Sequence, residues 1–505
     1  MANFGNKHLF YYKQKNTYAM HRKFVTNLIL LLSLNLLVKP FWIFGIDRTV
    51  QNLVGSGEYG WYSSILNFTF LFNILLDFGI TNFNNKNIAQ NNHLLNKHFS
   101  SIVIFKFLLA LIYIIVTFTV GLIWGYDSNQ LMFLLILGFN QIMISLILYL
   151  RSNISGILHF KTDSIISVLD RILMIVFCSV LLWGNLISLP FRIEWFIYAQ
   201  TAAYVITALT AMIIVMKKAA FKRLQWNFAF FLLIIRQSYP FAVLVLLMTF
   251  YNRIDSVMLE RMLPGDLGDW EAGIYASAYR LLDAINMIAY LFSVILLPIF
   301  AKLIKEKQSV ESLVRLAFTM IFTLSVTVSV NLCFYNFEFM DLLYENHKQE
   351  SADVFRFLIL GFIPIASTYI FGTLLTANGN LKWLNIIAFS GMILNISLNF
   401  LLIPTLKSVG SAYASLITQV FTAILQIVMV LLLFKFKINI RYVSSLLLFA
   451  LAVILMTWLA RSLVIEWKAG FTLSLTGAFI VAVALRLINF RSLIALLRSN
   501  ESMRS

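Results

Sequence analysis

Charged side chains inside apolar sequence are the part of this chain that could do chemistry. The segment 236–283 contains two apolar runs, each long enough to cross a bilayer. It carries the charged residues Arg236, Arg253, Asp255, Arg280 and Asp283. A charge at the centre of a membrane costs at least about 2.5–3.5 kcal/mol on insertion scales, so such residues usually face water or a partner. We therefore expect these two runs to line an aqueous cavity.

Six basic residues are candidate cavity cations, and four carboxylates accompany them. A cationic cavity suits an anionic substrate, because arginine binds phosphate bidentately and stays charged. The carboxylates are candidates for binding a coupling Na⁺ or H⁺. The candidate cations are Lys39, Lys106, Arg171, Arg236, Arg253 and Arg280, and the candidate ion-coupling residues are Asp77, Asp170, Asp255 and Asp283. The two lysines could instead extend their ammonium groups to the nearer membrane interface.

Two neighbouring pairs among these residues have local alternatives. Arg280 and Asp283 lie three residues apart on one helix face, which favours a local ion pair. Asp170 and Arg171 are adjacent, so their side chains point about 100° apart on a helix and need not pair. The spacing alone does not show whether these residues pair with each other or face the cavity.

The composition requires membrane helices to position these charges. Of 505 residues, 60% are hydrophobic and 12% charged, whereas soluble domains average about 25% charged. The mean hydropathy is +0.84. A net charge of +17 fits basic loops beside anionic lipid rather than nucleic-acid binding. The two cysteines lie in apolar runs and no Cys/His metal spacing occurs, so neither a disulfide nor a metal site is predicted.

Apolar runs predict an all-α integral membrane protein with about fourteen transmembrane helices. The runs centre on 24–46, 61–82, 99–123, 130–150, 164–184, 195–216, 230–258, 272–300, 313–336, 354–376, 381–404, 410–434, 442–464 and 470–490. Lys and Arg recur in alternate loops and at both ends of the chain, which predicts that both termini are cytoplasmic.

An internal repeat organises these spans. The motif Glu58-x-Gly60-x-Tyr62 returns as Glu271-x-Gly273-x-Tyr275. Each copy opens a predicted span, and the two spans lie six apart. An even offset preserves orientation, so two pseudo-symmetric six-helix lobes are predicted, with the substrate site between them. The predicted parts are a cytoplasmic segment 1–23, an N-lobe 24–216, a basic interfacial linker 217–229, a C-lobe 230–434, two extra helices 435–490 and a cytoplasmic tail 491–505.

The order of these features resembles the polysaccharide and O-antigen-type flippases of the multidrug/oligosaccharidyl-lipid/polysaccharide exporter superfamily. The resemblance covers spans one to twelve. It is carried by residues 50–90, by YNRIDSVMLERM followed by EAGIYASAYRLLDAINMIAYLFSVILLPIFAKL, and by residues 378–416.

The resemblance implies a function in glycan export. Such a protein carries a polyprenyl-diphosphate-linked oligosaccharide across the bacterial inner membrane, by rocking of two lobes around a cavity whose cations meet the diphosphate. The implied partners are this glycan, membrane lipids and glycan polymerase machinery. A monomer is expected, because one chain contains both predicted lobes. No cofactor is implied apart from a coupling Na⁺ or H⁺.

Three other functions stay open. A drug or cation antiporter of the same superfamily should have a carboxylate-dominated cavity, whereas cations here are at least as numerous. A membrane glycan polymerase, ligase or glycosyltransferase usually needs a sizeable outer loop, and no loop here is long enough for a catalytic domain. A sugar-nucleotide or small-solute carrier of another fold would be favoured by twelve spans instead of fourteen. We therefore predict a transporter and not an enzyme.

Overall fold

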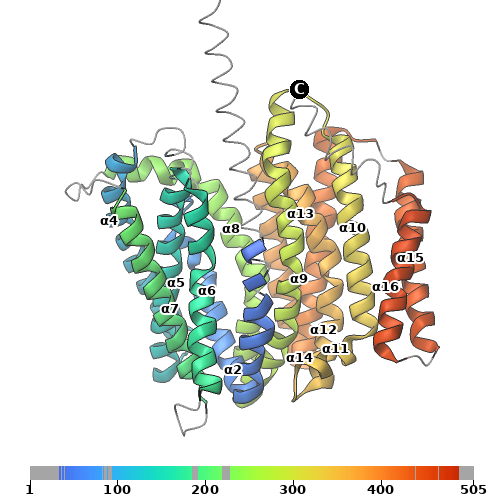
Figure 1. Cartoon of the computed structure of the whole chain (residues 1–505), viewed down its shortest axis with the longest axis horizontal. Coiled ribbons are helices and arrows are strands. Elements are labelled where there is room, and N and C mark those ends of the chain that lie inside the picture. Colours follow the sequence, from blue (N-terminus) through green and yellow to red (C-terminus); the bar gives the residue numbers. More distant parts are fainter. Residues whose placement is uncertain are drawn as a thin grey trace, which may run out of the picture. The chain divides into compact units, whose positions relative to one another are not determined.

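The chain is all-helical wherever its structure is described, in a computed structural model. The described residues are 33–35, 37–38, 40–81, 84, 88, 94–157, 159–184, 191–218, 228–437, 439–463 and 466–487. Within them there is no strand, and ten helices are long and apolar enough to cross a membrane (Figure 1). The predicted fold class, an all-α integral membrane protein, is confirmed. Lys39, the terminal segments 1–23 and 491–505, and most of the linker 217–229 lie outside the described residues.

The chain forms two compact units. Unit 1 comprises Met1–Val54 and Phe68–Ala242, and unit 2 comprises Gly55–Asn67 and Val243–Ser505. The units are defined by packing alone, so the predicted lobe, linker and tail boundaries stay predictions.

In its described part, unit 1 is built mainly from four long helices, the last of which packs against both of the two before it. They are α4 (Leu94–Ile123), α5 (Ser128–Gly156), α6 (Phe160–Trp183) and α7 (Ile193–Met216), with the short π-helix η1 (Trp42–Asp47) and the 3₁₀ helix η2 (Asn73–Leu76). The helix pairs α4–α5, α5–α7 and α6–α7 are in contact. A capping box defines the start of α5, because Asp127 accepts from the Gln130 amide while the Gln130 side chain accepts from the Asp127 amide.

The helix α2 (Arg48–Leu71) contributes to both units. It continues directly from η1, so Asp47 and Arg48 are helical where the sequence predicted a loop. The break comes instead at Gly55, where φ is 83° and ψ is 169°, a conformation that only glycine adopts readily. The helix ends at Leu71, earlier than the predicted span 61–82, because the backbone tightens into η2.

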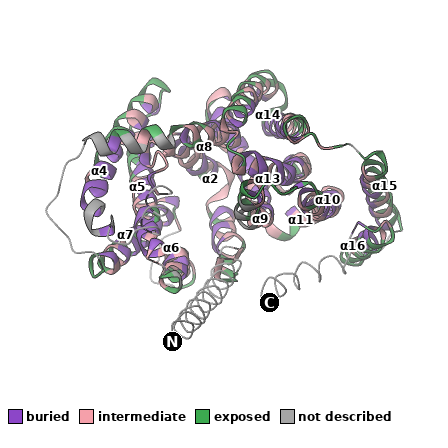
Figure 2. Cartoon of the chain, turned by 90° about the horizontal axis from the view of Figure 1, so that it is seen from above, coloured by how far each residue is buried: buried purple, intermediate pink, exposed green. Residues whose placement is uncertain are grey.

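Unit 2 contains the remaining helices. They are the greater part of α8 (Phe228–Met262), then α9 (Asp266–Lys305), α10 (Glu311–Phe334), α11 (Asn336–Leu343), α12 (Lys348–Leu360), α13 (Phe362–Ala377), α14 (Leu381–Phe434), α15 (Ile440–Ser462) and α16 (Trp467–Ala484). The helix α13 contacts α9, α10 and α14, and it is among the most buried parts of this unit (Figure 2).

The 54-residue α14 is a helical hairpin rather than one rod. Its backbone breaks at Lys407, where φ is 53° and ψ is −130°. The hydroxyl of Ser411 donates to Asn399 Oδ1 at 2.7 Å, although twelve residues would span about 18 Å in a straight helix. A Cβ on Gly391 would likewise lie 2.6 Å from Thr422 Cγ2. The two antiparallel passes correspond to the predicted spans 381–404 and 410–434.

The last two helices pack against α10 through an apolar cluster that includes Val326, Phe449 and Ala478. The side chains of Thr319 and Tyr442 share a hydrogen bond of 2.8 Å that ties α10 to α15. Away from this contact, much of α15 and α16 is exposed (Figure 2). The exposed residues of these helices include large apolar ones such as Leu451 and Ile480. Such a surface is typical of helices that face lipid.

Candidate functional site

Unit 2 contains a buried polar cluster around Asp255, which is 1% exposed. The Tyr275 hydroxyl of α9 donates to Asp255 Oδ2 at 2.6 Å. The amides of Asn399 and Asn395 in α14 donate to Oδ1 at 2.8 and 3.1 Å. Ser411, on the returning pass of α14, donates to Asn399 Oδ1 at 2.7 Å. Three helices therefore meet at this one carboxylate.

The cluster is chemically distinct from the other predicted carboxylates. Within the described part of the chain, Asp77, Asp170 and Asp283 each pair with a basic residue, whereas the hydrogen bonds made to Asp255 come from neutral groups. A buried carboxylate with amide and hydroxyl oxygens around it offers the hard oxygen ligands that alkali and alkaline-earth cations prefer. The same carboxyl group could alternatively carry a proton.

Two arginines flank the cluster along α8 and α9. The guanidinium of Arg253 lies 3.4 Å from Asp283 Oδ2 and 5.4 Å from the ring centroid of Tyr279. Arg280 donates through Nε to the hydroxyl of Tyr59 at 3.2 Å. The pair suggested by the spacing of Arg280 and Asp283 is thus replaced by a pair between helices, because α8 and α9 lie side by side and Asp283 faces α8.

Lys106 and Asp77 form a buried ion pair in unit 1. The ammonium of Lys106 lies 2.6 Å from Asp77 Oδ1 and donates to the Leu76 carbonyl and the Ser145 hydroxyl, both at 2.9 Å. The Thr81 hydroxyl donates to the same Asp77 oxygen at 2.6 Å. The lysine therefore uses its three protons to tie the end of η2 to α4 and α5, and it does not extend to an interface.

The remaining candidates in unit 1 have looser surroundings. Arg171 Nε lies 3.8 Å from Asp170 Oδ2, a long contact for an ion pair, and its guanidinium lies 5.7 Å from the ring centroid of Trp42. Arg236, on α8, is exposed. Of the candidate site residues, the structure brings together Arg253, Asp255, Arg280 and Asp283 in unit 2.

The second repeat motif, on α9, contacts three other helices within unit 2. The buried carboxylate of Glu271 accepts from the amide and the hydroxyl of Ser408, and it lies 3.4 Å from Lys407 Nζ. Glu271 thus caps the second pass of α14 at its N-terminus. Tyr275, one turn further along α9, holds Asp255 of α8. Between them, Gly273 packs against the carbonyl of Ser56 in α2.

The first repeat motif also belongs to unit 2. Gly60 packs against the carbonyl of Asp269, at the start of α9. Tyr62 is 2% exposed, and its ring centroid lies 5.7 Å from that of Tyr59. Glu58 is exposed at the start of the motif. The two copies of the motif are therefore in contact through their glycines.

No functional role was predicted for Asn395, Asn399 or Ser411. Asn395 and Asn399 lie four residues apart in an apolar run, and residues with that spacing share a helix face. Two asparagines on one face of an apolar helix were the signal in the sequence that could have indicated a polar site. The part played by Ser411 depends on the hairpin at Lys407, which no spacing in the sequence reveals.

Comparisons with known proteins agree with this architecture. A family model described as "Polysaccharide biosynthesis protein" matches residues 24–304. The solved structure of the lipid II flippase MurJ in an inward closed conformation is 14% identical, with a TM-score of 0.67 over 94% of this chain and 100% of that one. An inward-facing multidrug resistance MATE transporter of the MOP superfamily is 15% identical, with a TM-score of 0.59 over 81% and 98%. No curated protein sequence matches the chain. At these identities the likeness to the solved structures is one of fold.

Proposed function

The chain belongs to the polysaccharide biosynthesis protein family, and on that premise we propose that it carries a polyprenyl-diphosphate-linked oligosaccharide across the membrane. The family match spans residues 24–304, more than half of the chain. The multi-pass helical fold, which resembles that of MurJ and MATE transporters, supports transport rather than catalysis. A polysaccharide or O-antigen repeat unit is the proposed cargo.

The observation that carries this proposal is the depth of two arginines in unit 2. Arg253 lies nine residues before the end of α8 at Met262, or about 13 Å into the helix. Arg280 lies fourteen residues after the start of α9 at Asp266, or about 21 Å. The Arg253 side chain is 28% exposed. A partly exposed guanidinium at such depth needs water rather than hydrocarbon around it.

A diphosphate is the chemical group that these arginines suit. Guanidinium groups bind phosphate oxygens bidentately and remain charged in an apolar environment. The ion pair with Asp283 holds the Arg253 guanidinium in place, and a hydrogen bond to Tyr59 holds that of Arg280. The substrate diphosphate would then bind between charged side chains already held by neighbouring helices, while the lipid chain stays in the bilayer.

We further propose that the Asp255 cluster binds the coupling ion, Na⁺ or H⁺. Tyr275, Asn395 and Asn399 hold the carboxylate from two other helices. Occupation of the cluster would change the charge at the junction of α8, α9 and α14, and could thereby bias the alternating access of the two lobes. Asn395 and Asn399 can turn their amides to present oxygen to a metal cation.

The proposed setting is the bacterial inner membrane, with both termini in the cytoplasm. The alternation of basic loops along the chain supports this orientation. One chain contains both motif copies, which supports a monomer as the transporting unit. We propose that this monomer associates with glycan polymerase machinery.

Transport in proteoliposomes tests the proposal. A fluorescent polyprenyl-diphosphate oligosaccharide would be followed across the bilayer, with and without an ion gradient, for the wild type, Arg253→Ala and Arg280→Ala. Loss of a charged contact is worth about 1.5–3 kcal/mol, so each variant is expected to transport about tenfold or more slowly. Arg461→Ala is the matched control, because Arg461 pairs with Glu338 near the end of the peripheral helix α15.

Two outcomes would count against this function or this site. Wild-type protein that moves no such glycan but expels a cationic dye under an ion gradient would establish the drug antiporter instead. Glycan transport that survives both arginine substitutions would remove Arg253 and Arg280 from the binding site and leave the function standing.

A further inference from the structure

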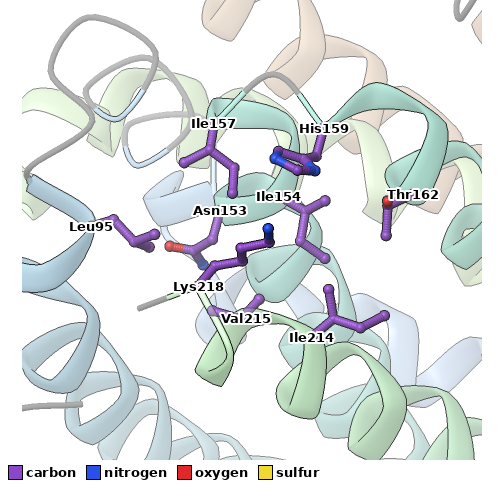
Figure 3. A pocket seen from close by; sticks show the side chains of 9 residues that line it. All are labelled: Leu95, Asn153, Ile154, Ile157, His159, Thr162, Ile214, Val215 and Lys218. Carbon is purple, nitrogen blue, oxygen red and sulfur yellow. The ribbon is translucent and has the colours of Figure 1, made fainter. Parts of the chain in front are cut away.

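A pocket of about 260 Å³ opens at one end of unit 1 (Figure 3). It lies where α5 ends, α6 begins and α7 ends, with the start of α4 beside it. The basic residues Arg151, Lys161 and Lys217 lie on the same helix ends. Basic loops of this kind predict the cytoplasmic side of the membrane. The pocket therefore lies at the predicted interface between the bilayer and the cytoplasm.

More than half of the residues that line the pocket are apolar, and together they form its apolar wall. It is formed by Leu95, Ile154, Ile157, Ile214 and Val215. Three of these residues, Leu95, Ile154 and Val215, are at most 4% exposed, so the wall is part of the packed helix bundle. Such a wall suits hydrocarbon and offers nothing to a hydrated inorganic ion.

The other lining residues are cationic or polar, and they lie among the apolar ones. In Figure 3 the Lys218 side chain runs through the middle of the pocket, with its ammonium end toward Ile154 and His159, and Thr162 lies beyond Ile154. Both Lys218 and His159 are exposed. His159 makes no side-chain cap at the start of α6, so the first-turn N–H groups of α6, which have no partner within the helix, add positive partial charge.

The nearby carboxylate does not neutralise the positive charge of Lys218 in the pocket. Arg151 pairs with Asp163 through contacts of 2.8 and 3.4 Å, so that carboxylate is already engaged. Among the residues that the structure describes, no carboxylate forms an ion pair with Lys218. An anion in the pocket would meet the lysine ammonium near the positive end of α6, and both of these groups commonly bind phosphate.

We propose that this pocket binds the phosphate of an anionic amphiphile. The first carbons of the amphiphile's hydrocarbon chain would then lie against the apolar wall. Pockets for whole drug-sized ligands measure about 300–1,000 Å³, so 260 Å³ suits a head group whose chain remains in the bilayer. A membrane phospholipid and a polyprenyl phosphate share this chemistry. The site goes beyond the proposed transport function, since its residues belong to unit 1 and include neither Arg253 nor Arg280.

Binding to the purified full-length protein in detergent tests the proposal. Native mass spectrometry would measure the affinity for short-chain phosphatidylglycerol, a short-chain polyprenyl phosphate and inorganic phosphate. Lys218→Ala is expected to weaken both amphiphiles about fivefold, since one cation near anionic lipid contributes roughly that much. Lys217→Ala is the matched control, because Lys217 is exposed on the same helix end but does not line the pocket. It is expected to change the affinity less than twofold.

A second variant separates the pocket from surface charge. Ile214→Trp keeps every cation but enlarges a side chain of the apolar wall, so that it fills part of the pocket, and it is also expected to weaken the binding of both amphiphiles about fivefold. Equal losses in Lys217→Ala and Lys218→Ala would overturn the proposal, as would unchanged binding in Ile214→Trp or equally tight binding of inorganic phosphate. Tighter binding of the polyprenyl phosphate would assign the pocket to a carrier lipid, and tighter binding of phosphatidylglycerol would assign it to the surrounding membrane.

Discussion

Gly60 and Gly273, the central residues of the two E-x-G-x-Y motifs, pack directly against each other. A Cβ on Gly60 would overlap the carbonyl oxygen of Asp269 and lie 2.5 Å from the amide nitrogen of Gly273. A Cβ on Gly273 would overlap the carbonyl oxygen of Ser56. Each glycine thus lies against the carbonyl of the residue four positions before the other motif's glycine. The two contacts are therefore equivalent, which supports the interpretation of the two motifs as copies of one repeat.

Gly60→Ala is expected to destabilise the protein by about 1–3 kcal/mol, the usual cost of overpacking. The new methyl group would overlap backbone atoms, which no rotamer change can relieve. Thermal unfolding in detergent measures the effect as a lower Tm. Gly57→Ala is the control, because a Cβ there has nothing within 4 Å, and helical Gly→Ala changes are then neutral or stabilising. Equal melting of Gly60→Ala and wild type would contradict the close packing.

Glu271→Ala is expected to cost about 1–3 kcal/mol, because it leaves the buried amide of Ser408 without its acceptor. Ser408→Ala removes the hydroxyl but keeps the amide donor, so a smaller loss is expected from it. Thermal unfolding of both variants compares the two contributions. If Ser408→Ala is as damaging as Glu271→Ala, the carboxylate does not act as the cap of the second α14 pass.

Asp255→Asn is expected to abolish ion-dependent stabilisation. A ligand that binds only the folded state raises stability by RT ln(1 + [L]/Kd), so the wild-type Tm should rise with Na⁺ against a choline control, or change with pH if the ion is H⁺. Asp283→Asn serves as the comparison, because Asp283 is already paired with Arg253. A Tm of Asp255→Asn that still responds to the ion as in the wild type would move the coupling site elsewhere.

The Lys106–Asp77 pair should respond unequally to its two single substitutions. Asp77→Asn leaves a lysine with a 6% exposed side chain without its counter-charge, and is expected to cost about 3 kcal/mol. Lys106→Met leaves a carboxylate whose side chain is 29% exposed, so a smaller loss is expected. The double variant should lose less than the sum of the two. Additive losses in a double-mutant cycle would show that the pair is not coupled.

The helices themselves were predictable. Within a membrane, an apolar run of about 20 residues must satisfy its own backbone hydrogen bonds, which an α-helix does. From α4 onward, most predicted spans differ from the observed helices only at their ends, but the span 354–376 is divided into α12 and α13 at Gly361, and the short α11 was not predicted. The errors occur where backbone geometry decides. The break at Gly55 and the early end of α2 at Leu71 depend on local φ and ψ values that hydropathy does not encode.

The candidate site was predictable in its residue types but not in its pairings. Spacing along one helix suggested a bond between Arg280 and Asp283, yet the partner of Asp283 is Arg253 on the neighbouring helix. Hydropathy does not specify the rotation of one helix against another. The repeat motif was visible as spacing, whereas the separate contacts of Glu271 and Tyr275 required three helices to be placed in space.

The reversal at Lys407 has a practical consequence for mapping this protein's topology. The chain turns between two membrane passes at a single non-helical residue, and that turn is fastened by Glu271. Among the described residues of α14, no loop separates the two passes there. An inserted epitope tag or protease site would therefore displace the second pass, which carries Ser411. Insertion scanning should therefore record an apparently forbidden position at 407, even though the Lys407 side chain is 46% exposed. Reporters would need to be placed in the connections on either side of the hairpin.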